Sequence, residues 1–138
     1  MDFQTAVRTR LQAIGAVLPS YTPTGGAATK PIFWGERPQT SPLPAIVLTI
    51  ISDPIPAHLK GYQQTRSTLM QMDVYAPKYN DAVAIKRAAI EILKVPAVTS
   101  GKTFACAFVD RQRDSIDTSG TINIYRQSAD ISVWHVGD

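Results

Sequence analysis

The chain has 138 residues and a mass of 15.0 kDa, close to the commonest size of a single domain, so we expect one domain over residues 1–138. A hydrophobic fraction of 44% and a charged fraction of 18% exclude a disordered chain, and a net charge of +3 is too small to indicate a dedicated nucleic-acid-binding protein. A single cysteine, Cys106, excludes an internal disulfide and fits a reducing compartment. The N-terminus lacks the pattern of a signal peptide, and no apolar run approaches the roughly 20 residues that span a bilayer, so we expect a cytoplasmic chain with no membrane partner.

Apolar residues recur near the N-terminus at the spacing of one face of a helix, and Gly15 then predicts the end of that helix. Arg10 lies largely outside this apolar stripe. Residues 20–29 are rich in Ser, Thr, Pro and Gly, and this composition predicts a mobile loop. The stripe consists of Phe3, Val7, Leu11 and Ile14.

Three strands are predicted in the middle of the chain. Residues 32–34 form a short one, and the continuous β-branched run at 45–51 predicts a buried one. Prolines and a glycine break the pattern over 53–61, which predicts a protruding connection to an antiparallel partner. That partner, residues 65–76, alternates between an apolar and a mixed side. The apolar side carries Met70, Met72, Val74 and Ala76, and the mixed side carries Leu69, Gln71, Asp73 and Tyr75.

The second half of the chain predicts one helix and two strands. Asn80 is placed to cap a helix that runs to about Lys94, with an apolar stripe built on Val83, Ile90 and Leu93. Residues 103–109 predict a buried strand, residues 110–120 a polar loop, and residues 121–136 a long final strand. The fold class is therefore α+β, with a mainly antiparallel sheet of four to five strands packed against two helices.

No catalytic signature is present in the sequence, and we predict no catalytic, metal-binding or cofactor-binding residue and no cofactor. Two histidines and one cysteine cannot supply a zinc site without carboxylates, and the spacing suggests none. Cys106 lies in an apolar strand, where a small buried side chain is expected. A small enzyme or ligand-binding domain that uses Cys106 or His58 is the alternative of another class. Asp110, Asp114 and Asp117 share a loop with two arginines, which favours a solvated loop or a subunit contact over a cation site.

Two regions are candidate interaction surfaces on physical grounds. The proline-stiffened loop at 53–64 presents apolar residues that can anchor a partner at little entropic cost, or fold back on the sheet. The mixed side of the third and last strands is the other region, although ordinary solvent exposure is favoured there. The first region offers Ile55, Leu59 and Tyr62, and the second includes Gln71, Asp73, Arg126, Ser128 and Asp130.

The order of these elements resembles the small tail-completion proteins of long-tailed bacteriophages, which include tail terminators and head–tail joining proteins. The similarity runs from about Phe3 to His135. A leading helix ends in LQAIGAV, and a proline-rich loop precedes a strand that begins PAIV. The strand MDVYA leads directly into a helix, and the terminal strand ends in Trp134-His135.

The resemblance implies a structural virion protein with no enzymatic activity. Such a protein forms a ring, usually a hexamer, at the head-proximal end of the tail tube, ends tube polymerisation and provides the docking surface for the head. Its implied partners are other copies of itself, the tail tube protein and the head–tail connector protein, and DNA passes through the ring without sequence-specific binding. A head–tail connector adaptor on the portal side is the alternative within this class. A closed ring needs two different patches on each subunit. The candidates are the 53–64 loop, with Ile55, Leu59 and Tyr62, and the 110–120 loop, with Arg111, Arg113 and Asp114.

Overall fold

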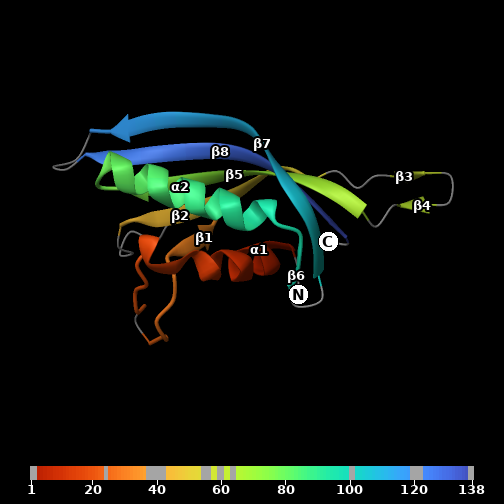
Figure 1. The fold of residues 1–138 in the computed structure, drawn as a ribbon, viewed down its shortest axis with the longest axis horizontal. Helices are drawn as coiled ribbons and strands as arrows, with labels where there is room; N and C mark the ends of the chain where they lie inside the picture. The colour runs from red at the N-terminus through yellow and green to blue at the C-terminus, as the bar shows by residue number, and fades with distance from the viewer. Residues whose placement is uncertain are drawn as a thin grey trace.

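Two helices lie on one face of a six-stranded sheet in the computed structural model (Figure 1). The structure describes residues 3–23, 25–36, 43–53, 57–58, 61–62, 65–99, 102–118 and 123–136. The helical elements are α1 (Phe3–Leu11), the 3-10 helix η1 (Gln12–Val17) and α2 (Tyr79–Lys94). The strands are β1 (Ile32–Trp34), β2 (Ala45–Ser52), β3 (Ala57–His58), β4 (Gly61–Tyr62), β5 (Thr65–Ala76), β6 (Ala97–Thr99), β7 (Lys102–Asp117) and β8 (Ile124–Val136).

The main sheet has the order β1-β2-β5-β8-β7-β6, and β3 and β4 form a separate two-stranded sheet. All neighbours in the main sheet are antiparallel except β1 and β2, which are parallel. The α+β class is confirmed, but the sheet has six strands instead of four to five, and one pair is parallel. The missed strand is β6, whose three residues are too few to show an alternating pattern.

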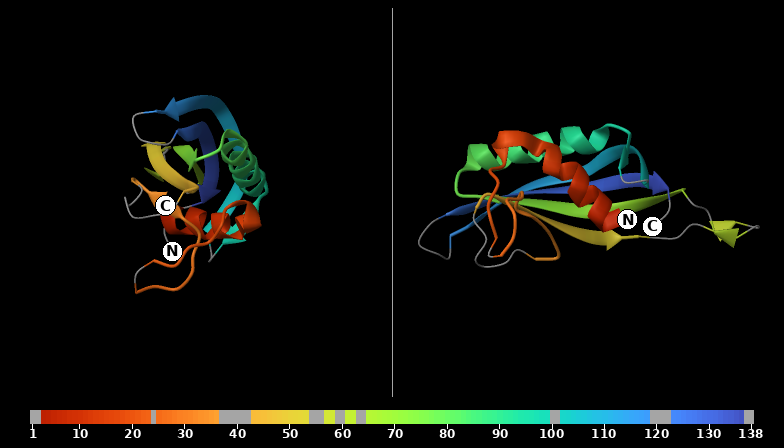
Figure 2. Two further views of the ribbon diagram at one scale, coloured as in Figure 1. Left: turned by 90° about the vertical axis from the view of Figure 1, so that its left-hand side faces the viewer. Right: turned by 90° about the horizontal axis from the view of Figure 1, so that it is seen from below.

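The centre of the sheet is the long pairing of β5 with β8, which runs from Thr65 opposite Val136 to Ala76 opposite Tyr125. The bounds of β5 agree with those predicted, and so does its antiparallel pairing with β2. Figure 2 shows that the sheet is strongly curved and that β3 and β4 lie beyond its end. These two strands belong to the connection between β2 and β5 that was expected to protrude.

The core lies between the helices and one face of the sheet. All four residues of the predicted α1 stripe are buried, and so are all four on the apolar side of β5. Each such side chain contributes roughly 1.5–3 kcal/mol of burial free energy, so this interface holds most of the hydrophobic stabilisation. Gly15 marks the end of the first helical segment as predicted, with a backbone φ of 83° that favours glycine.

Arg10 is buried between α1 and α2, although the sequence pattern placed it outside the apolar stripe. Its Nη2 donates hydrogen bonds to the carbonyl oxygens of Ile92, at 2.7 Å, and Val95, at 2.6 Å. Carbonyls at a helix C-terminus lack partners within the helix, so this side chain closes the end of α2. Its guanidinium carbon lies 5.0 Å from the centre of the Phe104 ring, and burial lowers the pKa of Arg10.

The second helix differs from prediction at its start and on its buried side. It ends at Lys94 as expected, but Lys78 occupies the N-cap position, and Asn80 lies inside the first turn, so the predicted Asn80 cap is wrong. Ile85 was missed in the buried stripe, and Val83 is only half-buried. Lys86 is buried, and its Nζ donates to Oε1 of Gln127 on β8 at 3.0 Å, which satisfies a cation beneath the sheet.

The largest correction concerns β7. Residues 110–117 continue the strand and pair with β8, where the sequence pattern had indicated a loop. These eight residues are all exposed, so the stretch lacks the apolar alternation that marks a strand. The predicted burial of 103–109 is also only partly right, because Phe104 and Ala107 are buried but Cys106 is exposed. In β2 the burial ends at Leu48, and Ile51 is exposed.

Candidate assembly surface

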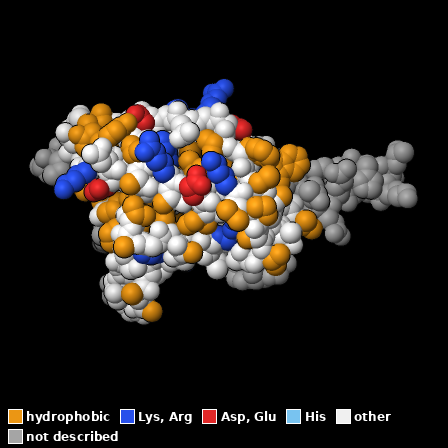
Figure 3. Space-filling model, viewed as in Figure 1, with side chains coloured by type: hydrophobic (Ala, Val, Ile, Leu, Met, Phe, Trp, Pro, Cys, Tyr) orange, Lys and Arg blue, Asp and Glu red, His pale blue; other side chains and the backbone are white. Residues whose placement is uncertain are grey.

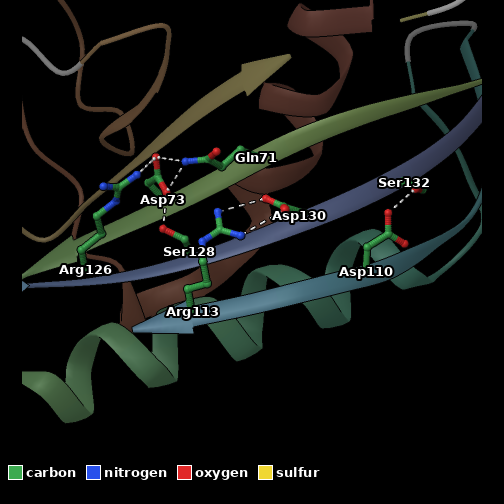
Figure 4. A network of polar contacts seen from close by, with 8 residues as sticks. All are labelled: Gln71, Asp73, Asp110, Arg113, Arg126, Ser128, Asp130 and Ser132. Carbon is green, nitrogen blue, oxygen red and sulfur yellow. Dashed lines mark hydrogen bonds and ion pairs between the residues drawn. The ribbon is translucent and has the colours of Figure 1, made fainter. Parts of the chain in front are cut away.

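The face of the sheet opposite the helices, here called the open face, carries most of the polar side chains of the three central strands. Residues paired across neighbouring antiparallel strands project to the same face. Asp73 is paired with Ser128, Gln71 with Asp130, and Ser128 also with Arg113 of β7. Figure 4 shows these side chains together on β5, β8 and β7.

Asp73 is the centre of a hydrogen-bond network on this face. Its carboxylate accepts a bond from the Ser128 hydroxyl at 2.5 Å, from Gln71 Nε2 at 2.9 and 3.0 Å, and from Arg126 Nη2 at 3.1 Å. Asp73 is only 5% exposed and Ser128 only 3%. Solvent exposure, which the sequence favoured for this face, is therefore wrong for these two residues, and the network fixes β5 to β8.

A second ion pair joins β8 to the edge of the sheet. Both terminal nitrogens of Arg113 donate to the Asp130 carboxylate, at 3.1 and 3.2 Å. This two-bond contact raises the pKa of Arg113 above its ordinary value, mainly through the hydrogen bond with Asp130. Ser132 donates to the Asp110 carboxylate at 3.1 Å, where a β-bulge interrupts the β7–β8 register.

Two shallow depressions lie on either side of Tyr75. One, of about 420 Å³, lies between Tyr75 and the ends of β7 and β8, and the other, of about 320 Å³, lies between Tyr75 and β2. The Arg126 guanidinium carbon is 5.8 Å from the centre of the Tyr75 ring. Both depressions are wide and open, which suits the contour of a neighbouring protein better than a small ligand.

The other end of the open face is apolar. Phe108 on β7 is paired with Ser132, and Trp134 lies one diagonal step further along β8. Phe108 is 55% exposed and Trp134 is 42% exposed. The Trp134-His135 pair of the sequence is thus divided between faces, because His135 is buried against the helices and stacks on Phe3 with 4.4 Å between ring centres.

The helix side has a different character. In Figure 3 its Lys and Arg side chains are scattered among acidic, hydrophobic and uncharged atoms and form no continuous field of one sign. Hydrophobic atoms gather toward the end of α2, where Val95 and Val98 are exposed. The described residues on this side therefore form no basic stripe of the kind that marks a nucleic-acid interface.

The predicted contact residues Arg111, Arg113 and Asp114 all lie on β7, beyond the part of that strand that pairs with β6. Asp114 accepts a hydrogen bond of 2.9 Å from the hydroxyl of Tyr79, which fastens this strand to the start of α2. This bond is the main reason that the pKa of Tyr79 is raised. Ile55 and Leu59 lie outside the described residues, and only the backbone of Tyr62 is described, in β4.

In the described residues Cys106 and the imidazole of His135 lie on opposite sides of the sheet and form no nucleophile–base pair. Cys106 is exposed on β7, whereas His135 is buried on the helix side, and the side chain of His58 lies outside the described part of the chain. A hydroxyl does approach an imidazole, since Thr68 Oγ1 lies 2.7 Å from His135 Nε2 and donates to Asp53 at 2.8 Å. Both Thr68 and His135 are buried from solvent, so this cluster serves packing.

Neither a cluster of metal-ligating residues nor a membrane-spanning helix occurs in the described ranges. No group of three or more His, Cys, Asp or Glu residues there could hold a metal ion. No helix in that part of the chain is long and apolar enough to cross a membrane.

The comparisons with known proteins give a structural likeness but no sequence-level match. No protein-family profile matches the sequence, and no curated protein matches it significantly. Among solved structures, the fold is similar to a chain of the structure described as "Virion of native gene transfer agent (GTA) particle". The TM-score is 0.59 at 16% sequence identity, and the match covers 98% of this chain and 95% of that chain. The two chains therefore share a fold over nearly their whole length.

Proposed function

We propose that this chain is a structural protein of a phage or phage-like virion and acts as a tail terminator. The observation that carries the proposal is the fold shared with a chain of a gene transfer agent virion over 98% of this chain. The sequence resemblance to tail-completion proteins supports the same class. In this role the chain forms a ring, in the family usually a hexamer, at the head-proximal end of the tail tube.

The surfaces of the subunit support an assembly role. The open face combines exposed Phe108 and Trp134 with a rigid ionic centre, whereas interface cores characteristically enrich aromatic residues and place polar groups around them. The proposed ring contacts are the 53–64 segment, with Ile55, Leu59 and Tyr62, and the β7 edge, with Arg111, Arg113 and Asp114. The proposed partners are the tail tube protein below and the head–tail connector protein above, with DNA passing through the ring.

Electron microscopy of particles from a producer that lacks this gene tests the proposal. We expect DNA-filled heads beside detached tails that are overlong or ragged, because tube polymerisation would have no stop. Detached tails of normal length would overturn the terminator role and assign head–tail joining instead. Intact, infectious particles would overturn the virion role altogether.

A further inference from the structure

The outer edge of β7 is bare over most of its length. The only strand beside β7 on that side is β6, which pairs with residues 102–104 alone among the described residues. Figure 1 shows β7 along the upper margin of the sheet with no further strand outside it. From Arg111 to Asp117 the register with β8 is regular, so this stretch presents ordinary strand backbone to an incoming strand.

This stretch is also largely open to solvent, because every residue from 110 to 117 is exposed. Soluble proteins protect bare strand edges with charges and bulges, and β7 has both. Its two bulges, however, lie before Arg111. The bulges therefore leave the seven regular residues accessible, and only the charges remain as a guard there. The charge pattern of this stretch therefore indicates which strands can pair with it.

The charges along the edge oppose pairing of two β7 strands with each other. The sequence Asp110-Arg111-Gln112-Arg113-Asp114 reads the same in both directions by charge. Twofold antiparallel pairing centred on Gln112 places Arg111 opposite Arg113, and centring on Arg111 or Arg113 places that arginine opposite itself. Like charges directly opposite one another are destabilising, so these three registers of self-pairing are disfavoured, and a strand without such charges meets no repulsion of this kind.

The hairpin formed by β3 and β4 lies outside the main six-stranded sheet. It forms a two-stranded sheet of its own, and such a sheet is at best marginally stable without a partner. Figures 1 and 2 place the hairpin and the C-terminal end of β7 at opposite ends of the longest axis, so the hairpin points away from its own β7 edge. A contact between the two therefore joins different subunits head to tail.

Charge complementarity favours the same contact. Residues 54–66, which contain the hairpin, include Lys60 and Arg66 and no acidic residue. On the β7 edge, Arg113 is neutralised by Asp130, which leaves one arginine beside the acidic residues of the stretch. The 110–114 stretch of the edge then carries two carboxylates, Asp110 and Asp114, beside Arg111.

We propose that the β3–β4 hairpin of one copy adds as a strand to the bare β7 edge of the next copy and that this contact closes the ring. The inference deepens the proposed function by naming the strand contact between subunits. Main-chain hydrogen bonds supply the affinity, and the charge pattern supplies the direction. Because the two elements are different surfaces, the contact repeats around a ring and does not stop at a dimer.

Cross-linking between engineered cysteines tests the contact. In a Cys106→Ser background, Ala57→Cys in the hairpin is combined with Ser115→Cys on the edge, and the purified protein is treated with a short bismaleimide. We expect a ladder of covalent oligomers from the double variant and dimers at most from each single variant. The matched control combines Ala57→Cys with Glu91→Cys, an exposed position on α2, and is expected to give no ladder.

The proposal is overturned if the double variant gives no ladder of oligomers, or if the control pair gives an equal ladder. Proline substitution supplies an independent test, because residues of opposite parity direct their N–H groups to opposite edges of a strand. Of Gln112→Pro and Ser115→Pro, one breaks a bond to β8 and lowers stability, and the other keeps the fold and loses the oligomer. A folded proline variant that still assembles would overturn the contact. If the protein forms rings but the double-cysteine variant gives no ladder, the strand contact is wrong and the terminator role stands. If tails have normal length in a producer that lacks the gene, the terminator role is wrong.

Discussion

Asp73 illustrates how a polar residue on an open sheet face becomes structural. Its carboxylate is the shared acceptor for donors on two strands, and the donors on β8 are far away in sequence. Charged hydrogen bonds in a nearly buried position stabilise more than exposed ones, since loss of the acceptor leaves the donors unpaired. The same arrangement holds the Arg126 guanidinium near the ring of Tyr75. Tyr75 separates the two depressions, and Arg126 lines one of them.

Replacement of this acceptor should therefore weaken the folded state. For Asp73→Ala we expect the free energy of unfolding to fall by about 2–3 kcal/mol, because the Ser128 and Arg126 donors lose their partner. Urea denaturation measures this loss. Asp73→Asn keeps the shape and one acceptor and should cost less. Glu91→Ala, at an exposed position near the C-terminus of α2, should change stability little, and equal losses at Asp73 and Glu91 would contradict the assignment.

The connection between α2 and β7 is the element-scale feature that the sequence did not suggest. Tyr79, in the first turn of α2, donates to Asp114 in a stretch that had been expected to be a loop. The T-shaped contact between Tyr79 and Tyr125, with 6.0 Å between ring centres, holds the phenol ring over β8. The exposed end of β7 is thus fastened to the helix as well as to its neighbouring strand.

This connection predicts a pH dependence above neutrality. The hydrogen bond to Asp114 raises the pKa of Tyr79 above its ordinary value of 10.0, so the bond contributes stability below pH 10 and loses it as pH rises through the raised pKa. We expect one tyrosine to ionise later than the others in an ultraviolet absorbance titration. Asp114→Asn should bring that transition down toward 10, and Tyr79→Phe should remove it. A late transition that survives Tyr79→Phe would refute the assignment.

The predictions from sequence were most accurate for elements whose periodicity is complete within the element. β5 shows strict alternation and ends at Ala76, just before Pro77, and both of its ends were predicted. The second half of β7 was missed because side chains exposed on both faces leave no period to detect. Asp73 was misjudged because its donors Arg126 and Ser128 lie 53 and 55 residues away, and Arg10 because its acceptors lie at the end of another helix.

At the scale of the whole molecule, the helices cover one face of the sheet and leave the other face open. The helices bury the face that carries Met70 and Met72, whereas Phe108 and Trp134 stay in contact with solvent on the open face. Aromatic residues are the commonest energetic hot spots of protein interfaces, and these two lie on adjacent strands. The open face is therefore the surface on which we expect a neighbouring virion protein to dock.

Loss of the two aromatic side chains should affect assembly and leave folding intact. For the double variant Phe108→Ser and Trp134→Ser we expect an unchanged thermal unfolding midpoint and at least a tenfold weaker association with the assembled tail, equivalent to about 1.4 kcal/mol. Sedimentation of tails with added protein measures the association. Val95→Ser, at an exposed apolar position on the helix side, is the matched control. Full association of the double variant would exclude this end of the open face as a docking site.

The long pairing of β5 with β8 has a mechanical consequence. The hairpin leads directly into β5, whose twelve residues are paired with β8 along their whole length. A pull along β5 from Thr65 that is opposed at the start of β8, beside Ala76, loads the hydrogen bonds between the two strands in shear, and they must break together. Strands peeled apart from one end break their bonds singly and yield at a lower force. The subunit is thus built to resist tension along its longest axis.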